Sequence, residues 1–101
     1  MVSRNKEKLE HAKKEVQTYN AYSIIKIEVV DLSKLSSYQE YEERFKFIHD
    51  YDIAILVNNA GIAFSGPVSE MKSSEVSDIM NVNCLHPLYL TKLLLPQMMK
   101  R

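Results

Sequence analysis

The chain has 101 residues, 46% hydrophobic and 26% charged, which is typical of one small globular domain and not of a disordered segment. Its formal net charge is zero and its pI is near 6.8, so it lacks the basic surface that nucleic-acid binding requires. Its apolar runs, such as residues 53–57, are far shorter than the roughly 20 residues that cross a bilayer, so we expect no membrane span in this chain.

An amphipathic helix is predicted near the start of the chain. Residues 1–3 are too few to define a strand, but apolar residues then recur at helical spacing between charged ones: Leu9, Ala12, Val16 and Tyr19. Residues 24–30 form a β-branched run interrupted by Lys26 and Glu28. This run predicts a strand with one face partly exposed to water.

A second surface helix and a buried strand are predicted next. Cap-forming side chains at Asp31 and Ser33 precede a charged stretch in which apolar residues step by three or four: Leu35, Tyr38, Tyr41, Phe45 and Ile48. The helix should end near residues 49–50. Residues 53–57 show no polar alternation, which predicts a parallel strand covered by helices on both faces.

A loop and a long helix complete the pattern. Residues 58–67 hold the only two glycines of the chain and should leave the carboxyl end of the preceding strand, where ligands bind in open α/β sheets. Apolar residues then follow a helical pattern from about Ser73 to Arg101. Pro87 should bend or interrupt this helix near Asn83, because proline lacks the backbone donor. The order of elements predicts an α/β fold with a parallel sheet.

The stretch from Leu56 to Gly61, Leu-Val-Asn-Asn-Ala-Gly, resembles the Asn-Asn-Ala-Gly motif that closes the fourth strand of short-chain dehydrogenases/reductases. Three further features occur at the intervals of that family: Ser3-Arg4 at the end of its second strand, Asp31-Leu32 at the end of its third, and Asn83 in the helix that follows the motif. Residues 3–9 and 95–98 are similar to the branch that contains 17-beta-hydroxysteroid dehydrogenases and very-long-chain 3-oxoacyl-CoA reductases.

This resemblance implies a partial Rossmann-like, doubly wound parallel sheet, with residues 1–101 as one partial dinucleotide-binding domain. The family's first strand and C-terminal half are expected to be absent, since no glycine-rich turn precedes Gly61 and the catalytic Ser, Tyr and Lys have no counterparts. Tyr22 and Lys26 match the Tyr-x-x-x-Lys spacing but precede the motif and enter a predicted strand, so they are rejected. We expect the chain alone to be inactive and only marginally stable.

The resemblance also implies the residues that would contact a nicotinamide cofactor: Ser3, Arg4, Asp31, Leu32, Asn58, Ala60 and Gly61. A guanidinium at position 4 suits a 2′-phosphate, which favours NADP(H) over NAD(H). Two of these assignments have plainer alternatives, Arg4 as a solvated arginine and Asp31 as a helix cap, and Asn59 beside them is as well explained as part of a structural turn. Gly61 would allow close approach and positive φ.

Asn83 is the predicted catalytic residue, because members of the resembled family use the main-chain carbonyl at this helix kink to hold a water in a proton relay. The alternative is an amide that fills the gap made by Pro87, and Asn81 is a nearby decoy. We expect no metal site, because Cys84 is the only cysteine and the three histidines lack ligand spacing.

The implied reaction interconverts a ketone and a secondary alcohol, with a lipid, steroid or acyl substrate. The implied location is the cytoplasm or the cytosolic face of the endoplasmic reticulum. A different possibility is a non-catalytic interaction module, or a homodimer, that pairs through the long helix with these residues facing a partner: Leu88, Tyr89, Lys92 and Leu95.

Overall fold

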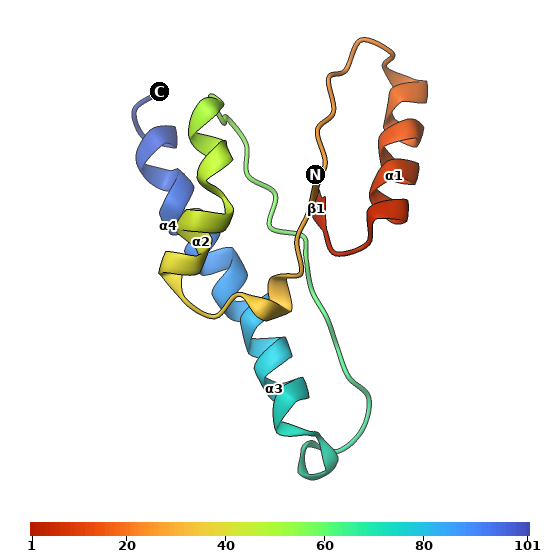
Figure 1. Cartoon of the computed structure of the whole chain (residues 1–101), viewed down its shortest axis with the longest axis vertical. Helices are drawn as coiled ribbons and strands as arrows, with labels where there is room; N and C mark the ends of the chain where they lie inside the picture. The colour runs from red at the N-terminus through yellow and green to blue at the C-terminus, as the bar shows by residue number, and fades with distance from the viewer. The chain divides into compact units, whose positions relative to one another are not determined.

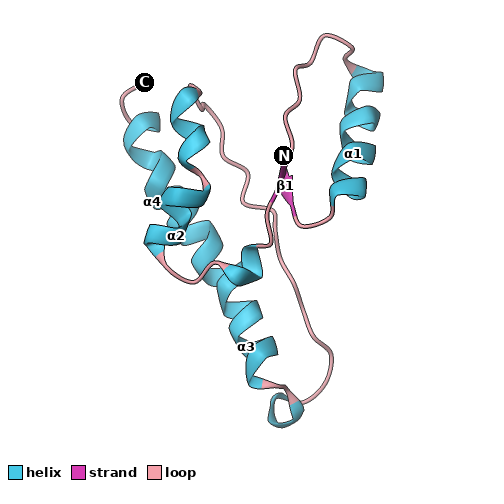
Figure 2. Cartoon of the chain, in the orientation of Figure 1, coloured by secondary structure: helices cyan, strands magenta, loops and turns pink.

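The computed structural model describes residues 1–101, and the chain divides into two compact units, Met1–Leu32 and Ser33–Arg101 (Figure 1). The first unit contains two short strands and a helix. The second is mainly helical and holds a long extended segment (Figure 2). The chain is thus a mixed α/β structure with a short parallel sheet, as the sequence predicts.

The first unit is a β-α-β arrangement of β1 (Val2–Ser3), α1 (Lys6–Tyr19) and β2 (Glu28–Val29). The predicted amphipathic helix is confirmed as α1, which begins after Asn5, whose side chain accepts a hydrogen bond of 2.9 Å from the backbone N–H of Lys8. The strands are parallel, with Val2 opposite Glu28 and Ser3 opposite Val29. A helix between two parallel strands is the usual crossover of α/β proteins.

The sequence left the first strand of this unit undefined and predicted the second too long. Residues 2–3, too few to define a strand from sequence, form β1 because the N–H of Glu28 donates to Met1 O and that of Val30 to Ser3 O, at 2.9 and 3.0 Å. The predicted strand over residues 24–30 shrinks to Glu28–Val29. A strand exists only where a neighbour pairs with it, so the short partner limits the longer apolar run.

The second unit contains one longer helix, α4 (His86–Met98), and two helices of seven residues each, α2 (Tyr38–Arg44) and α3 (Ser73–Ile79). A π-helical turn, η4 (Met80–Leu85), joins α3 to α4, so the predicted long helix and its interruption near Asn83 are confirmed. There are also three 3-10 segments: η1 (Leu32–Lys34), which begins at the last residue of the first unit, and η2 (Lys46–Asp50) and η3 (Val68–Glu70) in the second. The predicted second helix is confirmed in place, although its last part is the tighter η2.

A capping box fixes the start of α2. The Ser37 side chain accepts from the N–H of Glu40, and the Glu40 carboxylate accepts from the N–H of Ser37 at 2.8 Å. Hydrogen bonds from Ser36 and Ser37 favour the charged carboxylate and lower the pKa of Glu40.

The core of the second unit lies between α2 and α4, which run side by side in Figure 1. Tyr41 of α2 and Phe45, which directly follows α2, are fully buried, and their rings stack with centroids 5.6 Å apart. Tyr41 also contacts Tyr89 and His86 of α4, at 5.5 and 5.9 Å between ring centroids. Aliphatic side chains complete this core: Ile48, Val82, Leu90, Leu93 and Leu94.

The prediction of a buried strand at residues 53–57 is wrong. The segment is extended but has no partner strand, since the sheet of this structure contains β1 and β2 alone. The side chains of Ile55 and Val57 are 80% and 76% exposed. Backbone donors and acceptors without a neighbouring strand must face water, so the apolar sequence is not covered.

Candidate functional site

Asn83 lies in the π-helical turn, at the position that the sequence singles out. The N–H of His86 donates to Asn81 O, five residues back, so the hydrogen-bond ladder here is wider than in an α-helix. Pro87, in the first turn of α4, has no N–H to donate to the carbonyl of Asn83 four residues earlier. The Asn83 carbonyl therefore lacks its α-helical donor.

The side chain of Asn83 pairs with the backbone of Ile62 in both directions. The Ile62 N–H donates to Asn83 Oδ1 at 2.9 Å, and Asn83 Nδ2 donates to Ile62 O at 2.8 Å. This reciprocal pair resembles one step of a β-ladder, with an amide side chain in place of a second strand. It ties the loop after residues 58–61 to the π-helical turn.

Gly61 lies against this pair but does not meet the expectation of positive φ. Of the two glycines only Gly66 has positive φ, at 121°. A Cβ built on Gly61 would lie 3.7 Å from Asn83 Oδ1, an ordinary van der Waals distance. Neither backbone strain nor steric contact within this chain therefore requires glycine at position 61.

Asn58 is held by a residue that the sequence reasoning missed. Its Nδ2 donates to Thr91 Oγ1 of α4 at 3.2 Å, while the next two residues of the motif, Asn59 and Ala60, are exposed. Thr91 is a half-buried hydroxyl eight positions after Asn83 in a mostly apolar helix. Nothing in the sequence pattern marks this hydroxyl before its partner is known.

The other predicted cofactor residues lie together in the first unit. Ser3 ends β1 and exposed Arg4 follows it, while half-buried Asp31 and buried Leu32 come shortly after β2. Because β1 and β2 are parallel and adjacent, their carboxyl ends meet at one edge of the sheet. The structure thus brings Ser3 and Arg4 to the same edge as Asp31 and Leu32, and groups Asn58, Ala60 and Gly61 with Asn83 in the second unit.

Asn81, the nearby decoy, has a different partner. Its Nδ2 donates to the carbonyl of Ser33 at 2.8 Å, which ties the π-helical turn to η1. The two asparagines of the turn therefore bond two different segments of the second unit. Only Asn83 bonds residues 58–62, which we call the motif loop.

The histidines do not form a reactive group. His11 and His49 are exposed, and His86 is buried against Tyr41 with no hydrogen-bond partner at Nδ1. Burial lowers the pKa of His86 and raises that of Tyr41 to about 12. No three His, Cys, Asp or Glu side chains lie close enough together to hold a metal ion.

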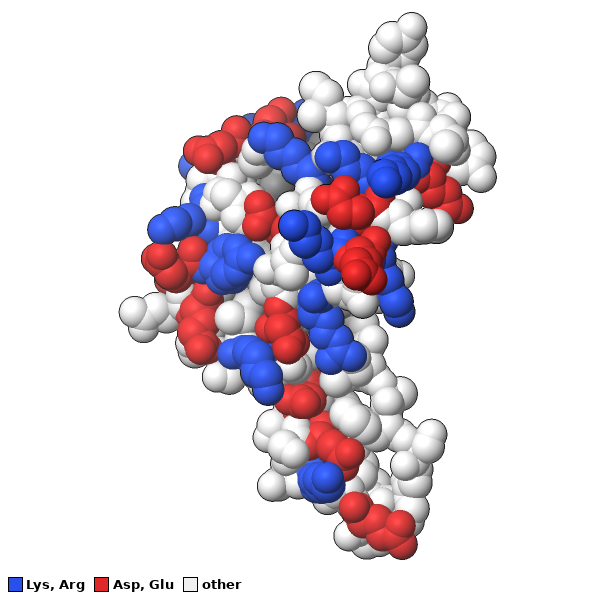
Figure 3. All heavy atoms as spheres, turned by 45° about the vertical axis from the view of Figure 1, so that its right-hand side comes forward, with Lys and Arg blue, Asp and Glu red and all other residues white.

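Charged side chains of both signs are mixed over the face drawn in Figure 3, with no extended region of one sign. None of the helices combines the length and the apolar character needed to span a bilayer. Neither a charged surface nor an apolar helix therefore indicates a binding function, and the polar residues around the motif loop remain the candidate site of the second unit.

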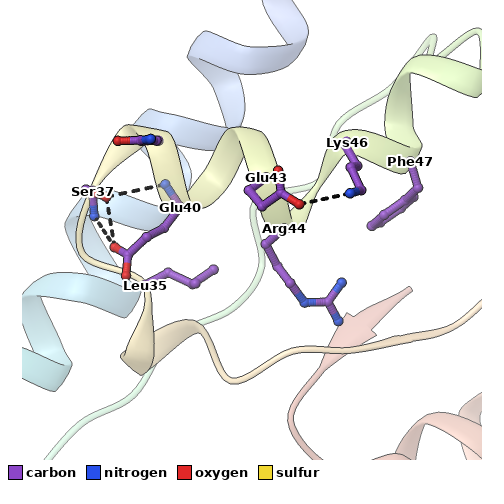
Figure 4. A pocket seen from close by; sticks show the side chains of 8 residues that line it. Leu35, Ser37, Glu40, Glu43, Arg44, Lys46 and Phe47 are labelled. Atoms are coloured by element: carbon purple, nitrogen blue, oxygen red, sulfur yellow. Dashed lines mark hydrogen bonds and ion pairs between the residues drawn. The ribbon is translucent and has the colours of Figure 1, made fainter.

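An open groove of about 580 Å³ lies beside α2 but shares no residue with the predicted site. Leu35 and Phe47 contribute apolar surface, and four of the polar side chains along it are paired with each other (Figure 4). Ser37 bonds Glu40, and Lys46 Nζ lies 2.8 Å from Glu43 Oε1. The groove therefore offers no convergent set of polar groups of the kind that orients a ligand.

Comparisons with known proteins agree with the resemblance. A sequence model described as short chain dehydrogenase matches residues 1–101. The chain is 36% identical over 103 residues to a very-long-chain 3-oxoacyl-CoA reductase of Coccidioides immitis, and 35% identical over 107 residues to a putative steroid dehydrogenase 4 of Caenorhabditis elegans. Both alignments cover 100% of this chain, and they span 29% and 40% of the two relatives. No solved structure matches.

The matching family consists of oxidoreductases that bind NAD(P). The names of the relatives agree with the branch that residues 3–9 and 95–98 indicated. The chain therefore belongs to the short chain dehydrogenase family, in the branch of the very-long-chain 3-oxoacyl-CoA reductases and steroid dehydrogenases.

Proposed function

We propose that residues 1–101 are part of the dinucleotide-binding domain of an NADP(H)-dependent oxidoreductase that interconverts a ketone and a secondary alcohol. The observation that carries this proposal is the reciprocal pair between Asn83 and Ile62 at the π-helical turn. It joins the predicted catalytic residue to the loop that bears Asn58, Ala60 and Gly61. Membership of the family makes this loop the expected cofactor side of the molecule.

Asn83 would act through its main chain. Its carbonyl lacks the α-helical donor because residue 87 is proline, and in this role it would accept a hydrogen bond from a water. The side chain has a different task, since both of its polar atoms bond the backbone of Ile62 and hold the loop. No Tyr-x-x-x-Lys pair follows the motif loop in this sequence, so the chain by itself should show no turnover.

The cofactor would supply or accept the hydride, and the chain would bind it at two places. At the edge after β1 and β2, Arg4 would pair with the 2′-phosphate beside Ser3, and Asp31 and Leu32 would contact the adenine. In the second unit, Asn58, Ala60 and Gly61 would let the backbone approach the nicotinamide side closely. The exposure of Arg4 and Ala60 leaves both places accessible to a ligand.

A lipid, steroid or acyl substrate is proposed from the names of the relatives, which act on acyl-CoA or steroid molecules. The cytoplasm or the cytosolic face of the endoplasmic reticulum is the proposed location, from the resemblance to this branch alone. Conversion of 3-oxoacyl-CoA against steroid ketones, followed as NADPH consumption in the full protein, would separate the two substrate classes.

The cofactor proposal is tested by titrating NADPH and NADH into the protein, with and without Arg4→Ala. A charge-assisted pair to phosphate contributes about 1.5–3 kcal/mol, so loss of Arg4 should weaken NADPH binding roughly ten- to hundredfold and NADH binding little. Lys14→Ala, which removes an exposed cation from α1, is the matched control. Equal affinities for NADPH and NADH in the unaltered protein would contradict the preference.

A second function, pairing through the long helix, is favoured by two exposed leucines. Leu88 and Leu95 are 63% and 46% exposed and lie seven residues apart, on one face of α4. Tyr89 and Lys92, also expected to face a partner, contact Tyr38 instead, with Lys92 Nζ 4.3 Å from the ring centroid. We propose a homodimer interface centred on Leu88 and Leu95.

Sedimentation velocity of the protein and of Leu88→Lys tests this interface. Insertion of a charge in an apolar contact should shift the protein from dimer to monomer. The exposed Val68→Lys is the matched control, since η3 lies outside the proposed face. A monomer at all concentrations in the unaltered protein would remove this second function.

A further inference from the structure

The motif loop is tied to the long helix at both of its ends. At one end, Asn58 Nδ2 donates to Thr91 Oγ1 at 3.2 Å, and at the other Ile62 is bound in both directions by Asn83. Between the ties lie Asn59, Ala60 and Gly61, which are exposed and belong to no strand. Side chains of the helix therefore provide this extended segment with hydrogen bonds, which in a β-sheet would come from a neighbouring strand.

The spacing of the two ties sets the shape of the loop. Thr91 lies eight residues beyond Asn83, about 12 Å along a helix at a rise of about 1.5 Å per residue. Residue 58 is four residues from residue 62, and four extended residues reach about 13–14 Å. The two lengths nearly match, so the loop is held almost straight and runs antiparallel to the helix, as Figure 1 shows.

We propose that Thr91 is a positioning residue for the nucleotide-facing loop. It acts through Asn58: the hydroxyl fixes one end of residues 58–62, and Asn83 fixes the other. This inference rests on the proposed function in one respect, namely that residues 58, 60 and 61 contact the cofactor. The tie itself is a property of the chain, with or without a ligand.

The chemistry of position 91 makes the proposal testable. Thr91→Val keeps the size and β-branching of the side chain and removes only the acceptor oxygen. Thr91→Ser keeps the oxygen and removes a methyl group. Thr18→Val is a matched control, because the Thr18 hydroxyl is also in a helix but bonds only within it, to Glu15 O at 2.6 Å.

The first measurement is the ¹⁵N order parameter of residues 58–62 in the protein without ligand. In Thr91→Val, the values for Asn58, Asn59 and Ala60 should fall from about 0.85 to below about 0.6, while that of Ile62 stays high because Asn83 still holds it. Thr91→Ser should restore the rigid values, and Thr18→Val should change none of them. Unchanged values at residues 58–60 in Thr91→Val would overturn the tie.

The second measurement is NADPH affinity by fluorescence titration in the same four proteins. Loss of one neutral hydrogen bond that orders the loop should weaken binding about fivefold, with recovery in Thr91→Ser. A loosened loop with unchanged NADPH affinity would overturn the positioning role. If no protein, including the unaltered one, binds NADPH, the proposed function fails while the order parameters still decide whether Thr91 holds the loop.

Discussion

Two apolar stretches of the second unit differ in the solvent exposure of their side chains. In α4, Leu90, Leu93 and Leu94 are buried against α2, whereas Ile55 and Val57 in the extended segment face water. From sequence, both stretches indicate core. A helix satisfies its backbone hydrogen bonds within itself and then packs, but a strand must obtain its hydrogen bonds from another segment before its side chains can be covered.

Truncation of one side chain in each stretch should produce the largest contrast. Leu94→Ala should lower the free energy of unfolding by about 2–5 kcal/mol, because Leu94 is 2% exposed and its removal leaves a cavity. Ile55→Ala removes a similar volume from a side chain that is 80% exposed, and it should cost less than about 0.5 kcal/mol. Urea unfolding followed by circular dichroism measures both.

The result could also go the other way. If Ile55→Ala costs as much as Leu94→Ala, residues 53–57 are covered in solution, for example by another copy of the chain. Dilution then provides the control, because a contact between copies makes the cost of Ile55→Ala depend on protein concentration.

The same contrast explains how much of the fold was predictable. The helical patterns located α1, α2 and the long helix, because helical periodicity is a local property. An interruption of the long helix could be placed near Asn83 from Pro87 alone, although its π-helical form could not. The first and last residues of the strands could not be predicted, because they depend on which segments pair. β1 consists only of the two residues that pair with Glu28–Val29, and residues 53–57 have no partner strand.

The candidate site was predictable to the same degree. Asn58, Ala60, Gly61 and Asn83 could be selected from the motif and its distance to the helix, and the structure groups them. Thr91 could not, because one hydroxyl in a helix has no distinctive pattern until its partner is known. The roles of all these residues in cofactor binding and catalysis stay predictions.

An acid titration should produce the next largest effect, and it concerns the helical core alone. Burial lowers the pKa of His86 below its ordinary 6.5, so above pH 6.5 the ring is neutral in both folded and unfolded chains and contributes no pH dependence. Below pH 6.5 the unfolded chain binds the proton first, and stability should fall by up to about 1.4 kcal/mol per pH unit. Urea unfolding at pH 7, 6 and 5 measures the slope.

His86→Phe, which keeps a ring against Tyr41, is the control for this slope. It should remove the loss of stability between pH 6.5 and 5. The lowered pKa values of Glu40 and Glu43 act in a different range, because their stabilising effect is present above the ordinary value of 4.5 and is lost only below it. A slope that survives in His86→Phe would assign the acid sensitivity to another group.

The smallest predicted effect compares one serine in each kind of region. Ser37 caps α2, so Ser37→Ala should cost about 1 kcal/mol of unfolding free energy. Ser65 is exposed between the motif loop and η3, and Ser65→Ala should change stability by less than about 0.5 kcal/mol. The cap stabilises α2 because the first N–H groups of a helix have no partner within it. A serine in the extended segment does not complete the hydrogen bonds of a helix end. Equal costs for the two substitutions, measured by urea unfolding at pH 7, would mean that Ser65 stabilises its segment as strongly as Ser37 stabilises α2.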